Sequence, residues 1–182
     1  SLHLLKLLSI GGNRFYDKRL EVKFDGLKFD NPVLVGAGWD KVGEAISALY
    51  HLGFAGVEVG TVLLHPQPGN PKPRQFMIGK GVALNRLGFN SPGMDVVAAN
   101  LKKYKKSGIP IGISIVKNKD IPDSKAPWVH AEVVKKLYPY ASYFAINVSS
   151  PNTPGLRKLQ DKKPLTAIVK AVNKAMDTLG GR

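Results

Sequence analysis

Three side chains that can hydrogen-bond a small ligand lie close together late in the sequence. They are Asn147, Ser150 and Asn152, and they follow the short apolar run 143–146. The run predicts a buried strand, and the Asn, Ser, Pro and Gly residues that come after it predict a loop. In parallel α/β folds, ligands bind at the loops that follow the strands. We therefore expect these side chains to form part of a binding site at a strand end.

Small and basic residues follow an earlier predicted strand at 32–37. The segment 36–41 reads Gly-Ala-Gly-Trp-Asp-Lys. Small residues allow the backbone to approach a ligand closely, and the Lys41 ammonium offers a positive charge to a phosphate or carboxylate. The alternative interpretation is a structural turn that carries a surface lysine.

A long polar excursion follows the strand predicted at 56–60. Gly60-Thr61 comes first, then the proline-rich run 66–74 and the segment 85–90, Asn-Arg-Leu-Gly-Phe-Asn. So many prolines predict a stiff loop, and long loops in compact domains are usually functional or disordered. A further polar segment, 117–120, follows the strand predicted at 109–115.

The sequence gives no support for hydrolytic or metal chemistry. Ser150 has no evident His and Asp partners, so a hydrolytic triad is unsupported. His65 alone among the four histidines is near a predicted strand end, and we expect it to have a surface or packing role. No spacing of His, Asp and Glu indicates a metal site, and the chain has no cysteine.

The elements that position these residues alternate between strand and helix, which predicts a parallel sheet. Strands are expected at 32–37, 56–60, 109–115 and 143–148, and helices at 42–51, 94–104, 128–138 and 165–179. Asp25-Gly26 between apolar strands at 20–24 and 27–29 predicts a hairpin, and the leucine-rich run 2–10 predicts a helix.

Four strand–helix units make half of an eight-fold β/α barrel. An isolated half barrel leaves two sheet edges open, which favours aggregation. We therefore expect about half of the domain to be absent from this chain. A flavodoxin-like open sheet of four or five strands is the structural alternative.

The composition sets the broad class. The chain has 182 residues, 43% of them hydrophobic, and a net charge of +14. No run of about 18 apolar residues indicates a membrane span. The positive charge is typical of proteins that attract nucleic acid, anionic lipid or acidic substrates. The alternative interpretation is a solvated basic surface without such a partner. No aromatic residues interleave with the lysine clusters as a base-stacking surface requires, so we expect no nucleic-acid partner.

The motifs together resemble the quinone-dependent, class 2 dihydroorotate dehydrogenases, in order from about residue 20 to 160. The resemblance rests on five segments: Gly38-Trp-Asp-Lys41, Glu58-Val-Gly-Thr61, the proline-rich run 66–74, the segment 85–90, and Asn147 to Arg157. It implies a (β/α)8 TIM barrel of which this chain supplies roughly the first four β/α units, in residues 20–182. Residues 1–19 would be the remnant of an N-terminal helical extension associated with the membrane and the quinone.

The resemblance also implies an activity. Such enzymes oxidise dihydroorotate to orotate in pyrimidine biosynthesis, with FMN as hydride acceptor and a quinone as final electron acceptor. The catalytic base in class 2 is a serine, which matches Ser150. The enzymes associate peripherally with a membrane, either in the cytoplasm or at the mitochondrial inner membrane.

The site residues are implied by the same resemblance. FMN contacts fall on Ala37, Gly38, Trp39, Asp40, Lys41, Thr61, Ser114 and Asn147. Substrate contacts fall on Lys41, Asn85, Arg86, Leu87, Gly88, Phe89, Asn147 and Asn152.

Three features depart from the family pattern. Ser114 replaces an asparagine, so its side chain has a shorter reach toward the flavin. Met77 replaces an arginine associated with the quinone site, which leaves the electron acceptor open. The later strands, with a further lysine and the FMN phosphate site, are absent, so this chain alone should be inactive.

Two other functions remain as alternatives. A non-catalytic half barrel would bind an anionic ligand or a partner chain without flavin. A basic nucleic-acid-binding domain would bind with steep salt dependence. The flavin content of the purified protein separates the dehydrogenase from the half-barrel remnant.

Overall fold

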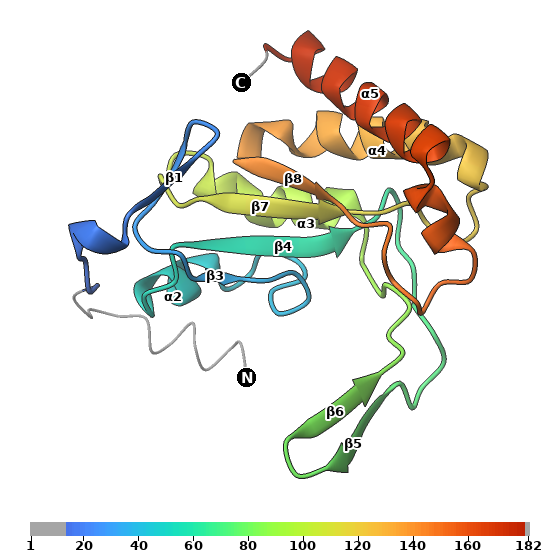
Figure 1. Cartoon of the computed structure of the whole chain (residues 1–182), viewed down its shortest axis with the longest axis horizontal. Helices are drawn as coiled ribbons and strands as arrows, with labels where there is room; N and C mark the ends of the chain where they lie inside the picture. The colour runs from blue at the N-terminus through green and yellow to red at the C-terminus, as the bar shows by residue number, and fades with distance from the viewer. Residues whose placement is uncertain (1–13, 181–182) are drawn as a thin grey trace.

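The computed structural model describes residues 14–180, and a four-stranded parallel sheet forms its centre (Figure 1). The strands are β3 (Leu34–Val35), β4 (Gly56–Val62), β7 (Ile111–Ile115) and β8 (Tyr143–Ile146). Their order in the sheet is β3-β4-β7-β8, the same as in the sequence. In a flavodoxin-like sheet the spatial order of the strands reverses at a switch point. In a barrel each new strand is added beside the previous one. The prediction of a partial barrel is therefore confirmed.

Helices alternate with these strands and bury one side of the sheet. They are α2 (Ile46–His51), α3 (Met94–Leu101), α4 (Ala126–Leu137) and α5 (Lys162–Thr178). Val57, Ile113 and Ile115 are fully buried, and they belong to one hydrophobic cluster with residues of all four helices. Residues two apart on a strand share a face, so every second strand residue faces this core.

The intervening strand residues form a row on the opposite face of the sheet. Glu58, Gly112 and Tyr143 are paired across β4, β7 and β8. The Tyr143 hydroxyl donates a hydrogen bond to the Glu58 carboxylate at 3.1 Å. Burial is the main cause that raises the pKa of Tyr143, and the negative charge of Glu58 adds to it. The pair joins β4 to β8 across the glycine between them.

This packing predicts that Gly112→Ala destabilises the sheet. A Cβ at Gly112 would overlap the Tyr143 ring, and overpacking of this kind costs about 1–3 kcal/mol. Urea unfolding should show a lower free energy of unfolding than the unaltered chain. Gly79→Ala is the matched control, because the nearest atoms to its Cβ lie 3.9 Å away. Equal stability of the two variants would contradict the packing.

The predicted N-terminal hairpin is confirmed. Strands β1 (Val22–Phe24) and β2 (Leu27–Phe29) pair antiparallel around Asp25 and Gly26. These two residues have φ values of 47° and 75°, as the type I′ turn of a two-residue hairpin requires. A short 3₁₀ turn, Lys18–Leu20, precedes the hairpin.

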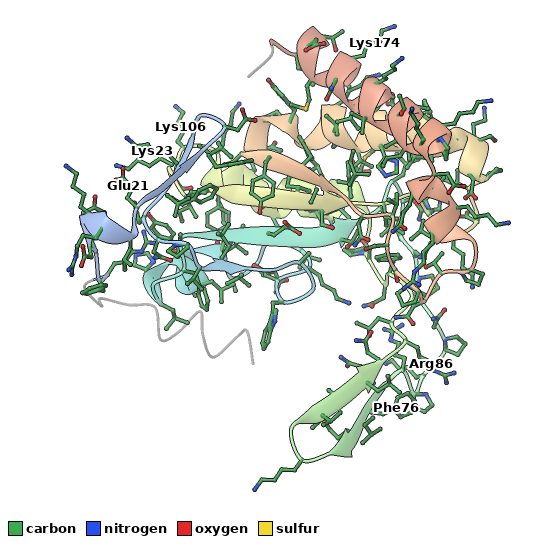
Figure 2. All side chains as sticks on the ribbon, in the orientation of Figure 1. Glu21, Lys23, Phe76, Arg86, Lys106 and Lys174 are labelled. Carbon is green, nitrogen blue, oxygen red and sulfur yellow. The ribbon has the colours of Figure 1, made fainter. Side chains whose placement is uncertain are left out.

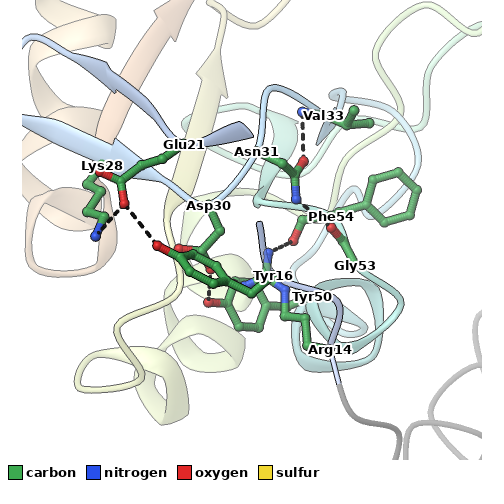
Figure 3. A network of polar contacts seen from close by, with 10 residues as sticks. All are labelled: Arg14, Tyr16, Glu21, Lys28, Asp30, Asn31, Val33, Tyr50, Gly53 and Phe54. Carbon is green, nitrogen blue, oxygen red and sulfur yellow. Dashed lines mark hydrogen bonds and ion pairs between the residues drawn. The ribbon is translucent and has the colours of Figure 1, made fainter. Parts of the chain in front are cut away.

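A polar network holds the first described residues against the amino ends of the strands (Figure 3). The Arg14 guanidinium pairs with Asp30, donates to the carbonyl of Phe54 at 2.9 Å and lies 3.7 Å from the Tyr50 ring centroid. The Asn31 amide donates to the carbonyl of Gly53 at 2.9 Å. The network connects the hairpin region to the turn between α2 and β4, at the amino ends of the strands.

The main difference from the sequence prediction is a second hairpin. Residues expected to form a loop instead make β5 (Gln75–Gly79) and β6 (Val82–Asn85), which project from the body of the molecule (Figure 1). The strands are short, and Gly79-Lys80-Gly81 between them resembles a loop signal. The Arg86 guanidinium lies 5.8 Å from the Phe76 ring centroid at the base of this hairpin (Figure 2).

Other boundaries shift by a few residues. The strand predicted at 32–37 contains only β3, and the helix predicted at 42–51 begins at Ile46. The helix predicted at 94–104 is α3 followed by a 3₁₀ turn, Lys102–Tyr104. The helix expected at 2–10 and most of the extension expected at 1–19 lie outside the described residues. Within residues 14–180 no helix has the length and apolar character to cross a membrane.

Candidate active site

A row of hydrogen-bonded polar side chains lies at the carboxyl ends of β4, β7 and β8. The Asn147 amide nitrogen donates to Thr61 Oγ1 at 3.1 Å, and Thr61 Oγ1 lies 3.1 Å from Ser114 Oγ. Only glycine fits at position 60, where φ is 115° and a Cβ would lie 2.6 Å from the Ser114 carbonyl oxygen. The three strand ends are thereby held in fixed positions.

Most of the predicted site residues line one cavity of about 280 Å³ beside this row. Four segments that are far apart in the sequence meet there: the ends of β3, β4 and β8, and the loop after β6. The predicted residues that line it are Ala37, Gly38, Lys41, Thr61, Asn85, Leu87, Gly88, Phe89, Asn147, Ser150 and Asn152. The arrangement expected from residues at strand ends is therefore present.

Four predicted residues lie outside this cavity, and three of them have structural partners. Asp40 is fully buried, and its carboxylate accepts hydrogen bonds from the backbone amides of Glu44 at 2.9 Å and Ala45 at 2.7 Å. Ser114 is buried behind Thr61. The Arg86 guanidinium donates to the carbonyl of Pro73 at 3.0 and 3.1 Å. These side chains shape the loops and do not line the cavity.

The fourth, Trp39, is 76% exposed and lines an adjoining cavity of about 850 Å³. This second cavity also contains Lys72, Arg74 and Gln75. The two cavities share Gly38, Lys41, Leu87 and Asn90. Two ligands bound in them would therefore meet at the same few residues.

Lys41 supplies the positive charge at the boundary of the two cavities. Its ammonium donates a hydrogen bond to Asn90 Oδ1 at 2.8 Å. Burial is the larger cause that lowers the pKa of Lys41, and the nearby charge of Arg74 adds to it. No ion pair found within residues 14–180 includes Lys41, and no acidic residue occurs from 59 to 94. A half-buried ammonium without a carboxylate favours an anionic ligand.

Ser150 is positioned by the backbone of its own loop. Its Oγ accepts a hydrogen bond from the Asn152 backbone amide at 3.2 Å. The Asn152 side-chain amide reaches across the cavity to the carbonyl of Asn85 at 3.5 Å. In the described part of the chain, no hydrogen bond links Ser150 to a His, Asp or Glu side chain. The geometry does not provide the paired base of a hydrolytic serine.

The sequence assigned no role to two residues, Asn90 and Asn118, that hold other side chains in place. Asn90, which holds Lys41, ends the polar segment 85–90, so its position was the available signal. The buried Asn118 side chain donates to His65 Nδ1 at 3.0 Å and to its carbonyl at 2.9 Å. The His65 side chain, for which we predicted a surface or packing role, is 43% exposed and has Asn118 as a hydrogen-bond partner. Among residues 14–180, no group of three His, Cys, Asp or Glu side chains could hold a metal ion.

Comparisons with known proteins show which family this chain resembles. The family model described as dihydroorotate dehydrogenase matches residues 19–179. A dihydroorotate dehydrogenase (quinone) of Erythrobacter litoralis is 47% identical over 176 residues, which are 96% of this chain and 51% of the relative. One of Shewanella loihica is 51% identical over 152 residues, which are 81% of this chain and 44% of the relative. The chain thus spans about half the length of the curated relatives it matches.

Solved structures give the same result for the fold. The dihydroorotate dehydrogenase of Eimeria tenella in complex with ferulenol has a TM-score of 0.88 and 38% identity, over 97% of this chain and 50% of that one. The ligand-free form of the same enzyme also has a TM-score of 0.88. The four strand–helix units are therefore similar to half of a known barrel enzyme.

Proposed function

Because the chain belongs to the dihydroorotate dehydrogenase family, we propose that it supplies the amino-terminal half of a quinone-dependent dihydroorotate dehydrogenase. The whole protein would oxidise dihydroorotate to orotate in pyrimidine biosynthesis. The observation that carries the proposal is the convergence of Lys41, Asn147, Ser150 and Asn152 on one cavity. The residues come from two loops, after β3 and after β8, that are far apart in the sequence, so a general structural need does not explain their meeting.

The residues present fit the part of FMN that this half would contact. A Cβ at Gly36 or Gly38 would have no atom within 4 Å, which leaves open space above the end of β3 for a flat ring system. Thr61 and Asn147 place a hydroxyl and an amide beside that space. FMN supplies the acceptor for the hydride that dihydroorotate gives up. The FMN phosphate would be held by residues of the other half of the barrel.

The charge and donors of the cavity suit an anionic, amide-rich substrate. Dihydroorotate carries a carboxylate and ring amide groups, and Lys41 offers an ammonium without an acidic partner. Asn147 and Asn152 carry amides that both donate and accept hydrogen bonds. Fixed donors of this kind stabilise negative charge that develops during reaction. We assign Lys41, Asn147 and Asn152, with the loop 85–89, to substrate binding.

Ser150 Oγ would take the proton from C5 of dihydroorotate and pass its own hydroxyl proton to water or a nearby hydroxyl, while the C6 hydride goes to FMN. A serine hydroxyl is a weak base, so its oxygen needs a fixed position and support for charge. The Asn152 backbone amide supplies one donor to Ser150 Oγ. Negative charge develops on the substrate as the C5 proton leaves. Lys41 and the side-chain amides would stabilise this charge, which makes the C5 proton more acidic.

The second cavity is our candidate for the approach of the electron acceptor. Trp39 gives it an exposed aromatic wall, and it meets the substrate cavity at Gly38 and Lys41. Met77, on β5, is 73% exposed and stands where the family usually has an arginine. We propose a quinone as acceptor and peripheral contact with a membrane through residues 1–19.

Steady-state oxidation tests this proposal on the protein completed by its second half barrel. We expect orotate formation that depends on dihydroorotate and reduces a soluble quinone analogue. Orotate formation that occurs with another electron acceptor but not with the quinone analogue would refute the quinone assignment. A protein that contains no flavin would instead favour a non-catalytic half barrel that binds an anionic ligand.

A further inference from the structure

Two loops form opposite walls of the candidate substrate cavity. The substrate loop is 85–90, which begins at the last residue of β6, and the serine loop is 147–152, after β8. The side chain of Asn70 lies between them. Its amide nitrogen donates to the carbonyl of Arg86 at 2.9 Å and to the carbonyl of Asn152 at 3.4 Å. One side chain outside the cavity thus contacts both walls.

The amide group of Asn70 is chemically matched to this position. A side-chain amide nitrogen has two hydrogens, and here each has a carbonyl acceptor on a different loop. The Asn70 backbone amide also donates to the carbonyl of Leu87 at 3.0 Å. Serine could satisfy only one of the two carbonyls, and an aspartate could satisfy neither.

Asn70 is itself held by a rigid surrounding. The Arg74 guanidinium donates to the carbonyls of Pro68 at 2.6 Å and Asn70 at 3.1 Å. Gly88 has a φ of 68°, and a Cβ there would lie 2.6 Å from the Asn70 side chain. The surrounding prolines restrict the backbone further. The amide therefore has little freedom to follow either loop if that loop moves.

We propose that Asn70 is a positioning residue that fixes the serine loop relative to the substrate loop. The inference rests on the proposed function of these loops. Asn152 connects the two effects, because its carbonyl accepts from Asn70 while its backbone amide donates to Ser150 Oγ. Within the described structure, the only direct hydrogen bond found between these two loops runs from the Asn152 side chain to the Asn85 carbonyl and is 3.5 Å long. Loss of the Asn70 donors should therefore let Ser150 move relative to bound substrate.

The test uses Asn70→Asp and Asn70→Ala in the protein completed by its second half barrel. Asp keeps the shape but replaces the donors with an oxygen, and Ala removes the donors without adding charge. Asn173→Asp, on the exposed face of α5, is the control for the same chemical change. We expect both Asn70 variants to retain FMN and to reduce it about 10- to 100-fold more slowly at saturating dihydroorotate. Orotate affinity should change much less than this rate.

A second readout does not depend on activity. Backbone amide hydrogen exchange should become faster in both loops, 85–90 and 147–152, of the Asn70 variants. In the Asn173→Asp control, exchange in both loops should be unchanged. Unchanged exchange in the serine loop would overturn the inference, and so would an unchanged reduction rate in an active protein. If the unaltered protein is not reduced by dihydroorotate, the proposed function fails, and the exchange result alone decides the coupling.

Discussion

Replacement of Ser150 by alanine should slow the reduction of bound flavin by dihydroorotate by about 10²- to 10⁴-fold, the usual contribution of a general base. The change removes the oxygen that we propose accepts the C5 proton. It leaves Thr61 and Asn147 in place, so FMN should stay bound. Anaerobic stopped-flow absorbance of the flavin measures the rate directly.

The matched control is Ser124→Ala, which removes an exposed serine in a 3₁₀ turn, Asp123–Lys125, before α4. This variant should reduce its flavin at the unaltered rate. Near-normal reduction in Ser150→Ala would refute the role of Ser150 as base. A variant that has lost FMN would instead assign Ser150 to cofactor binding.

Replacement of Lys41 by methionine should weaken orotate binding and at the same time stabilise the fold. Hydrogen bonds to charged groups contribute about 1.5–3 kcal/mol, so we expect a loss of affinity of about 10- to 100-fold. The ammonium is partly desolvated and has no acidic partner in the described structure. Its removal should raise the melting temperature of the ligand-free protein, as at other functional sites that trade stability for binding.

The pH dependence follows from the direction of the pKa shift. Burial and Arg74 lower the pKa of Lys41 in the folded protein. Below that lowered pKa the residue is charged, binds anions and carries the full desolvation cost. As pH rises through the folded-state pKa, orotate affinity should fall, and the contribution of Lys41 to the free energy of unfolding should rise. Both changes should be absent from Lys41→Met.

Lys41→Arg is the control for charge alone. It keeps a cation that does not titrate in this range, so affinity should depend less on pH than in the unaltered protein. Equal orotate affinity in Lys41→Met and the unaltered protein would exclude Lys41 from substrate binding. A lower melting temperature in Lys41→Met would show that the ammonium stabilises the fold.

Regular patterns in the sequence predicted most of the fold. Asp25-Gly26 specified a turn that the structure contains, and strand–helix alternation predicted the parallel sheet. The β5–β6 hairpin was missed because its strands are short and its turn contains two glycines. Nothing local to residues 75–85 distinguishes a projecting hairpin from an irregular loop.

The site was predictable where a residue lies at a strand end or in the loop just after it, as Thr61, Asn147 and Ser150 do. The site was less predictable where a side chain forms hydrogen bonds with backbone groups. Asp40 stands in a segment that resembles a ligand loop, yet its oxygens accept from amides four and five residues later. Asn70 contacts carbonyls 16 and 82 residues away in sequence, which no local pattern can reveal.

An anaerobic absorption spectrum, recorded before and after addition of dihydroorotate, tests the central claim most directly. The protein should be purified with the part that completes its barrel. We predict a flavin spectrum that bleaches on addition of dihydroorotate, because in our proposal the cavity lined by Lys41, Asn147 and Ser150 would hold the substrate beside FMN. A bound flavin that dihydroorotate leaves oxidised would contradict the account.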